Sequence, residues 1–125
     1  MIRTSLWALV AYYLLTGLYI AVLPHDFYLN APGARETGPY NMHFIRDVGF
    51  AFLTSAAAIA YGLYRDMKPL MVFGALWLLI HGLFHFTLWA LHGMALDRAA
   101  LIDFAAVSLP AVAVFVLSLR YRSAS

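Results

Sequence analysis

The chain contains no cysteine, and this absence removes several kinds of chemistry at once. A protein without thiols has no disulfide, no thiolate metal site and no thiol redox reaction. The cysteine content therefore leaves the redox compartment open.

Charge is also scarce in this sequence. Charged residues make up 11% of the 125 residues, whereas a soluble domain carries about 25%. The formal net charge of +2 is too small and too scattered to indicate a nucleic-acid partner. Hydrophobic residues, in contrast, make up 64%, more than a soluble protein of this size could bury. The composition predicts an integral membrane protein.

Four apolar stretches are long enough to cross a bilayer, which requires about 20 mostly apolar residues. They lie at residues 5–23, 41–64, 69–91 and 98–119. Helices are the default spanning structure because lipid offers backbone groups no hydrogen-bond partners. We expect an all-α fold with one four-helix transmembrane domain over residues 1–125. The only long loop, at residues 24–40, joins the first two helices.

Basic residues indicate the orientation of these antiparallel spans. The side of the termini would carry Arg3, Arg65, Lys68, Arg120 and Arg122. The opposite side would carry Arg35, Arg46 and Arg98, diluted by five carboxylates. The positive-inside rule then places both termini in the cytoplasm and the long loop outside. We expect a bacterial inner membrane protein.

Local features of two spans predict how the helices end and pack. Three pairs of small residues lie four apart in the second span: Ala51 and Ser55, Ala56 and Ala60, and Ala58 and Gly62. This spacing allows close helix approach. In the fourth span, Asp97 is the expected N-cap, and Pro110 predicts a kink.

Ionisable residues gather in one half of the predicted bundle. His81 and His85 share a face of the third span, because residues four apart are offset by about 40° on a helix. His43 and Asp47 share a face at the start of the second span, and Asp103 lies one to two turns into the fourth. Antiparallel threading puts all five in the outer half, while the inner half is almost entirely apolar.

Two further histidines belong to the same end of the bundle. His25 follows the first span, and His92 ends the third span near Trp89, where an interfacial position explains it without a ligand.

Ionisable groups within a membrane are costly and mark a functional site by default. We expect His81, His85, Asp47 and Asp103 to point inward, around a cavity between the second, third and fourth spans. The alternative is structural, with the carboxylates bonding histidines or Arg46 to lock the bundle.

Three ligands fit these residue types, and the cofactor-binding candidates are His43, Asp47, His81, His85 and Asp103. A transition metal such as zinc, iron or copper would use His81 and His85, completed by Asp47, Asp103 or His43. A haem b would need two axial ligands from facing helices, such as His43 and His85. A quinone would need a hydrogen-bond donor under an apolar slot, which a histidine with an aspartate partner provides while also carrying protons.

One stretch supports a family resemblance. The second span opens with Phe-Ile-Arg-Asp-Val-Gly at residues 44–49, after a long loop. In this layout the chain resembles the DoxX-like group of small four-helix membrane proteins. The resemblance covers most of the chain and implies the four-helix fold, and some members of the group are associated with redox enzymes. It assigns no catalytic residue, and the histidine-rich third span is not part of the pattern.

Three functions follow from these observations. The chain is predicted to be an accessory subunit of a membrane redox complex, in contact with lipids and other membrane subunits, whose His/Asp cluster binds a quinone, a lipid or a partner. The alternatives are a metal- or haem-binding membrane oxidoreductase and a small transporter or proton-conducting module. The apolar inner half counts against a path through the membrane. Whether the protein is an enzyme stays open.

Overall fold

The computed structural model describes residues 1–91 and 93–122, without the side chains of residues 36 and 37. His92 therefore lies outside the described residues. Four long helices account for the spans: α1 (Ile2–Val22), α3 (Met42–Tyr64), α4 (Lys68–Leu91) and the continuous stretch Arg98–Arg120. That last stretch comprises α5 (Arg98–Asp103), the π-helical η2 (Phe104–Ser108) and α6 (Leu109–Arg120).

All four helices are long and apolar enough to cross a membrane, which confirms the predicted all-α four-helix membrane fold. The connection between the first two spans contains more structure than the expected loop. It holds the short helix α2 (Pro24–Asn30) and the 3-10 turn η1 (Ala34–Thr37). Pro24 suits the first turn of α2, because its missing amide hydrogen would have no partner there.

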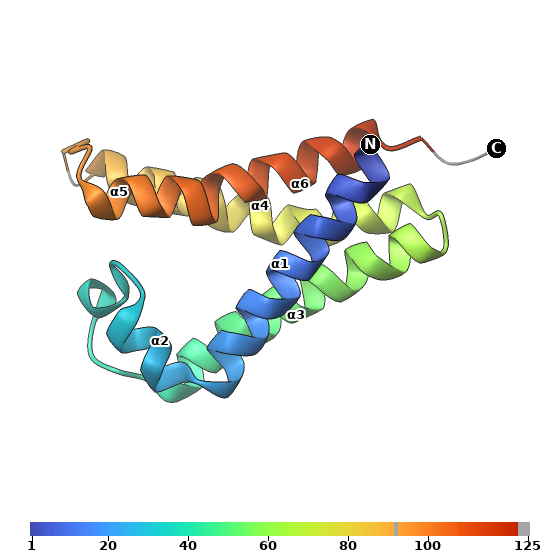
Figure 1. The fold of residues 1–125 in the computed structure, drawn as a ribbon. Coiled ribbons are helices and arrows are strands. Elements are labelled where there is room, and N and C mark those ends of the chain that lie inside the picture. The colour runs from blue at the N-terminus through green and yellow to red at the C-terminus, as the bar shows by residue number, and fades with distance from the viewer. Residues whose placement is uncertain (92, 123–125) are drawn as a thin grey trace.

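The helices form two pairs that diverge (Figure 1). At the end that carries the N-terminus the four helices lie together, and toward the other end α1 and α3 separate from α4 and α5. The helix α2 lies at this diverging end, next to the end of α1. We refer to the diverging end as the outer end.

Glycines set the close crossing of α1 and α3. A Cβ atom added to Gly17 would lie 2.9 Å from the Gly49 carbonyl oxygen, and one added to Gly49 would lie 2.8 Å from the Ala21 nitrogen. The two backbones therefore touch. On the outer-end side of this crossing, the Nε atom of Arg46 donates a hydrogen bond of 3.1 Å to the Ala21 carbonyl, one of the last carbonyls of α1. Such carbonyls have no partner within their own helix.

Small residues also join α3 to α4. A Cβ atom on Gly74 would lie 2.9 Å from the Cβ atom of Ala58 and 3.1 Å from the Ser55 carbonyl oxygen. Ser55 and Ala58 belong to the small-residue pairs expected to permit close approach. Their partner is a glycine on the following span.

The fourth span is interrupted where Pro110 was predicted to act. Pro110 has no amide hydrogen for the carbonyl four residues earlier, which belongs to Ala106. The π-helical η2 lies directly before this point. The Tyr12 hydroxyl of α1 donates to the Ala106 carbonyl, and the Ser108 hydroxyl donates to the Gly82 carbonyl of α4 at 3.1 Å. The interruption thus bonds to both neighbouring helices.

The antiparallel arrangement predicts that Ala34 and Ser123 lie on opposite sides of the membrane. Because the chain has no cysteine, Ala34→Cys or Ser123→Cys would supply the only thiol. A membrane-impermeant maleimide added to one side of intact cells or sealed vesicles should label one variant, and label the other only after permeabilisation. Labelling of both variants from the same side would refute the four-span topology.

Tyr12→Phe should destabilise the protein because it leaves the Ala106 carbonyl unpaired within lipid. Side-chain hydrogen bonds between transmembrane helices contribute about 0.6 kcal/mol on average and up to about 1.7 kcal/mol. In a Pro110→Ala background the restored amide can bond Ala106, so Tyr12→Phe should cost less there. Unfolding in mixed SDS micelles would measure the free energy of unfolding of each variant in this double-mutant cycle. Tyr61→Phe, at an exposed position, is the control. Equal costs in both backgrounds would contradict the pairing.

Candidate functional site

The structure divides the predicted cluster into two groups. His43 and Asp47 form one pair on α3, and His81, His85 and Asp103 form a second group between α4 and α5. Within residues 1–91 and 93–122, no set of three or more His, Cys, Asp or Glu side chains is arranged to hold a metal ion. The four-residue metal set proposed from the sequence is therefore not assembled in this structure.

The pair on α3 faces away from the bundle. His43 Nδ1 lies 2.9 Å from Asp47 Oδ2, and the two side chains are 86% and 58% exposed. Ile45 and Gly49, the buried neighbours of Asp47, each lie two positions from it and so about 200° around the helix. The expectation that Asp47 points inward is wrong, because those two residues occupy the buried face of α3.

The position of His43 also bears on the haem hypothesis. Phe52 contacts His81 of α4, with ring centroids 5.4 Å apart. His43 lies nine residues before Phe52, which places it about 180° away on the same helix. His43 and His85 therefore do not face each other as two axial ligands would.

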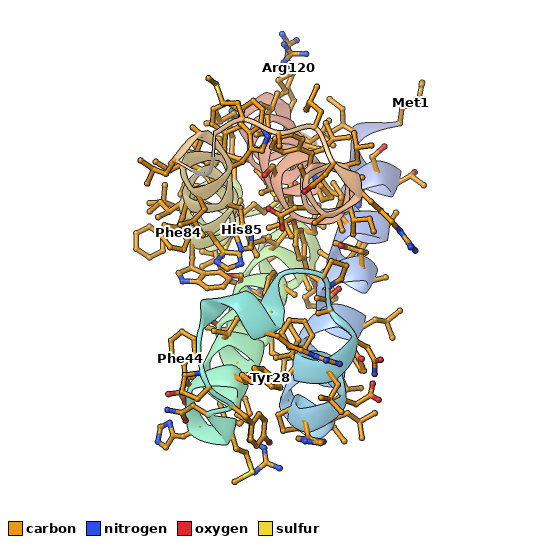
Figure 2. The ribbon with its side chains drawn as sticks, turned by 90° about the vertical axis from the view of Figure 1, so that its left-hand side faces the viewer. Met1, Tyr28, Phe44, Phe84, His85 and Arg120 are labelled. Atoms are coloured by element: carbon orange, nitrogen blue, oxygen red, sulfur yellow. The ribbon has the colours of Figure 1, made fainter. Side chains whose placement is uncertain are left out.

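The second group is centred on a half-buried ion pair or hydrogen bond between helices. His85 Nδ1 lies 2.8 Å from Oδ1 and 2.9 Å from Oδ2 of Asp103, and the two side chains are 26% and 27% exposed. Figure 2 shows His85 pointing from α4 toward the middle of the molecule, whereas Phe84 points away. Because a carboxylate only accepts hydrogen bonds, Nδ1 carries the proton of this contact. Nε2 is then the ring nitrogen left for a ligand.

Local structure explains how Asp103 reaches His85. Asp97 caps α5 by accepting a hydrogen bond of 2.8 Å from the Ala100 amide, which confirms the predicted N-cap. Asp103 is the last residue of α5, and η2 follows it directly. Such π-helical turns often occur at functional sites.

His81 is enclosed by aromatic rings. Its ring is nearly parallel to that of Trp77, with centroids 4.9 Å apart and an angle of 11°. The Phe52 ring is nearly perpendicular to it, and the His85 ring centroid lies 4.6 Å away. Tyr13 of α1 stacks on the other side of the series, 5.8 Å from Phe52. Rings from three helices thus lead to the His85–Asp103 pair.

The sequence reasoning missed these aromatic neighbours. Trp77 was detectable, because it lies four residues before His81 and so shares its face. Tyr13 gave no such signal. Its side chain is 2% exposed, and its hydroxyl has no hydrogen-bond partner in the described part of the chain. A buried unpaired hydroxyl costs about 1–3 kcal/mol, so such groups are rare in folded proteins.

Two hollows occur at the outer end. One, of about 370 Å³, is lined by Asn30, Pro32, Arg98, Ala99 and Ile102. It lies between the end of α2 and α5, and Ala99 shares a helix face with Asp103 because the two are four residues apart. The other, of about 180 Å³, is lined by Met42, His43, Arg46, Asp47 and Phe50.

Neither hollow is lined by His81 or His85. The expected cavity between the second, third and fourth spans therefore stays a prediction.

The chain matches no protein-family model, no curated protein and no solved structure. The resemblance to the DoxX-like group stays a prediction, and function must be inferred from the residues themselves.

Asp103→Asn should destabilise the protein more than Asp47→Asn. Asp103 accepts a half-buried bond from His85, and hydrogen bonds to charged groups contribute about 1.5–3 kcal/mol. The Asp47 pair is exposed, and such pairs contribute about 0–1 kcal/mol. SDS-induced unfolding of the two variants in one detergent would compare them. An equal or larger loss for Asp47→Asn would contradict the assignment of Asp103 as the interhelical anchor.

Asp66, in the turn between α3 and α4, is not a neutral control for these two variants. It accepts a hydrogen bond of 2.6 Å from the Tyr121 hydroxyl, and its φ angle is 58°. A leucine there would lose the bond and adopt a backbone conformation that most side chains avoid.

Proposed function

We propose that this integral membrane protein binds the head group of a quinone-type lipid at His85 and Asp103, as an accessory subunit of a membrane redox complex. The observation that carries the proposal is the contact of His85 Nδ1 with both carboxylate oxygens of Asp103. It fixes one ring nitrogen and leaves the other for a ligand.

This pair suits both oxidation states of a quinone. With Nδ1 protonated and the ring neutral, Nε2 accepts a hydrogen bond from a quinol hydroxyl. When the ring takes up a second proton, Nε2 donates to a quinone carbonyl.

The surroundings supply the apolar surface that a quinone ring requires. Trp77 and Phe52 lie against His81, whose ring contacts His85. The hollow of about 370 Å³ between α2 and α5 is lined by Ala99, one turn before Asp103, and ligand pockets commonly measure about 300–1,000 Å³. We infer that the head group enters from this hollow while its isoprenoid tail stays in lipid.

The accessory role rests on the electron acceptor that quinol oxidation requires. A quinol gives up two electrons and two protons, and a redox centre of a partner subunit would accept the electrons. The layout-level resemblance to the DoxX-like group agrees with such an association. We place the protein in a bacterial inner membrane with cytoplasmic termini, because basic residues favour the side of the termini. The site then lies in the outer half.

The other functions have less support. A metal site lacks an assembled set of three or more ligands among the described residues, and His43 and His85 do not face each other as haem ligands would. A transport path lacks ionisable groups in the inner half, since residues 53–64, 69–80 and 104–119 contain no Asp, Glu, Lys, Arg or His. Metal analysis and an absorption spectrum of gently purified protein would test the first alternative directly.

Quinone binding should quench the fluorescence of Trp77. The chain has three tryptophans, so Trp7→Phe and Trp89→Phe leave Trp77 as the only reporter. In nanodiscs, titration with decylubiquinone should give saturable quenching. Asp103→Asn should weaken binding about tenfold, which corresponds to the loss of roughly one charge-assisted hydrogen bond.

Asp47→Asn serves as the matched control, because it removes an outer carboxylate that does not contact His85. It should leave the quenching curve unchanged. Linear, non-saturating quenching that is identical in all variants would indicate simple partitioning of quinone into lipid and refute the site.

A further inference from the structure

The hollow of about 180 Å³ on α3 contains a cation and an anion that do not pair with each other. Arg46 and Asp47 both line it. Asp47 forms its ion pair with His43, one turn earlier on α3. Arg46 uses Nε to bond the Ala21 carbonyl, and its two terminal nitrogens have no partner in the described part of the chain. The hollow thus presents separate positive and negative groups.

The hollow lies at the membrane surface and opens to lipid. Asn41 caps α3 by accepting a hydrogen bond of 3.1 Å from the Phe44 amide, so the helix begins just before His43. Residues 42–50 therefore cover about 12 Å from the outer end of the span, which takes in the interfacial layer of roughly 5–8 Å and the first part of the hydrocarbon core. Met42 and Phe50 are exposed, and Phe44, on another face of α3, also points away from the bundle (Figure 2).

Each group in the hollow is held in place. The Ala21 carbonyl fixes the guanidinium of Arg46 against the end of α1. His43 Nδ1 holds the Asp47 carboxylate one turn away along the same face. A guanidinium binds phosphate oxygens through paired hydrogen bonds, and a carboxylate accepts bonds from an ammonium group. Phe50 and Met42 add apolar surface that an acyl chain can cover.

We propose that this hollow binds the head group of a zwitterionic phospholipid with a primary ammonium. Arg46 binds the phosphate, Asp47 binds the ammonium, and the start of an acyl chain lies along Phe50. The anionic head group of phosphatidylglycerol lacks the ammonium and is repelled by Asp47. A choline head group carries the positive charge but has no N–H to donate to the carboxylate.

This site is separate from the proposed quinone site. His43 lies about 180° from Phe52 around α3, and Asp47 about 140° from it. The bound lipid would stabilise the joint of α1 and α3, because Arg46 touches both the lipid and the end of α1. Failure of either proposal leaves the other intact.

The test compares three lipids on delipidated protein in a mild detergent. Native mass spectrometry would measure binding of palmitoyl-oleoyl phosphatidylethanolamine, phosphatidylcholine and phosphatidylglycerol. We expect the ethanolamine lipid to bind about fivefold more tightly than the choline lipid, the equivalent of roughly 1 kcal/mol for the ammonium hydrogen bond that choline cannot donate. The glycerol lipid should bind most weakly.

Two variants separate the roles of the charges. Asp47→Asn should remove the preference for ethanolamine over choline, while Arg46→Gln should weaken all three lipids. Asp26→Asn, which changes another exposed carboxylate at the outer end, should retain the wild-type preference. Because Arg46 also bonds α1, Asp47→Asn decides the proposal if Arg46→Gln does not fold. Equal binding of ethanolamine and choline lipids to the wild-type protein, or tightest binding of the glycerol lipid, would overturn it.

Discussion

The crossing of α1 and α3 at Gly17 and Gly49 decides which way α3 faces, and the rest of the site depends on that rotation. Any side chain at either position would collide with backbone atoms of the other helix. With Gly49 against α1, Phe52 and Ser55 reach α4, where Phe52 contacts His81. The same rotation turns His43 outward. One backbone contact thus turns His43 and Asp47 outward rather than into the bundle.

Features that depend on a single helix were predicted correctly from the sequence. Four spans follow from composition, because a bilayer leaves few alternatives for a long apolar stretch. The pairing of His43 with Asp47 and the closeness of His81 and His85 follow from spacing by four residues. The step between helices is different. Matching depth brought Asp103 to His85 but not Asp47, because depth along a span says nothing about rotation around its axis.

The fourth span illustrates a second kind of information that sequence alone conceals. Pro110 predicts a carbonyl that lacks its helical hydrogen bond, and within lipid that carbonyl requires another donor. The donor is Tyr12, almost a hundred positions earlier in the chain, a pairing that no local pattern could reveal. Tyr13, the next residue, turns about 100° around α1 and stacks on Phe52 instead. Neighbours in sequence therefore serve two different helices.

Ionisable groups are distributed unevenly between the two ends of the bundle, and the His85–Asp103 pair lies on the polar side. Toward the end that carries the termini, residues 53–64, 69–80 and 104–119 contain no acidic, basic or histidine side chain. Toward the outer end, the hollow beside Ala99 lies within one turn of Asp103 along α5. The His85–Asp103 pair thus lies toward the polar outer end rather than within the apolar part of the bundle.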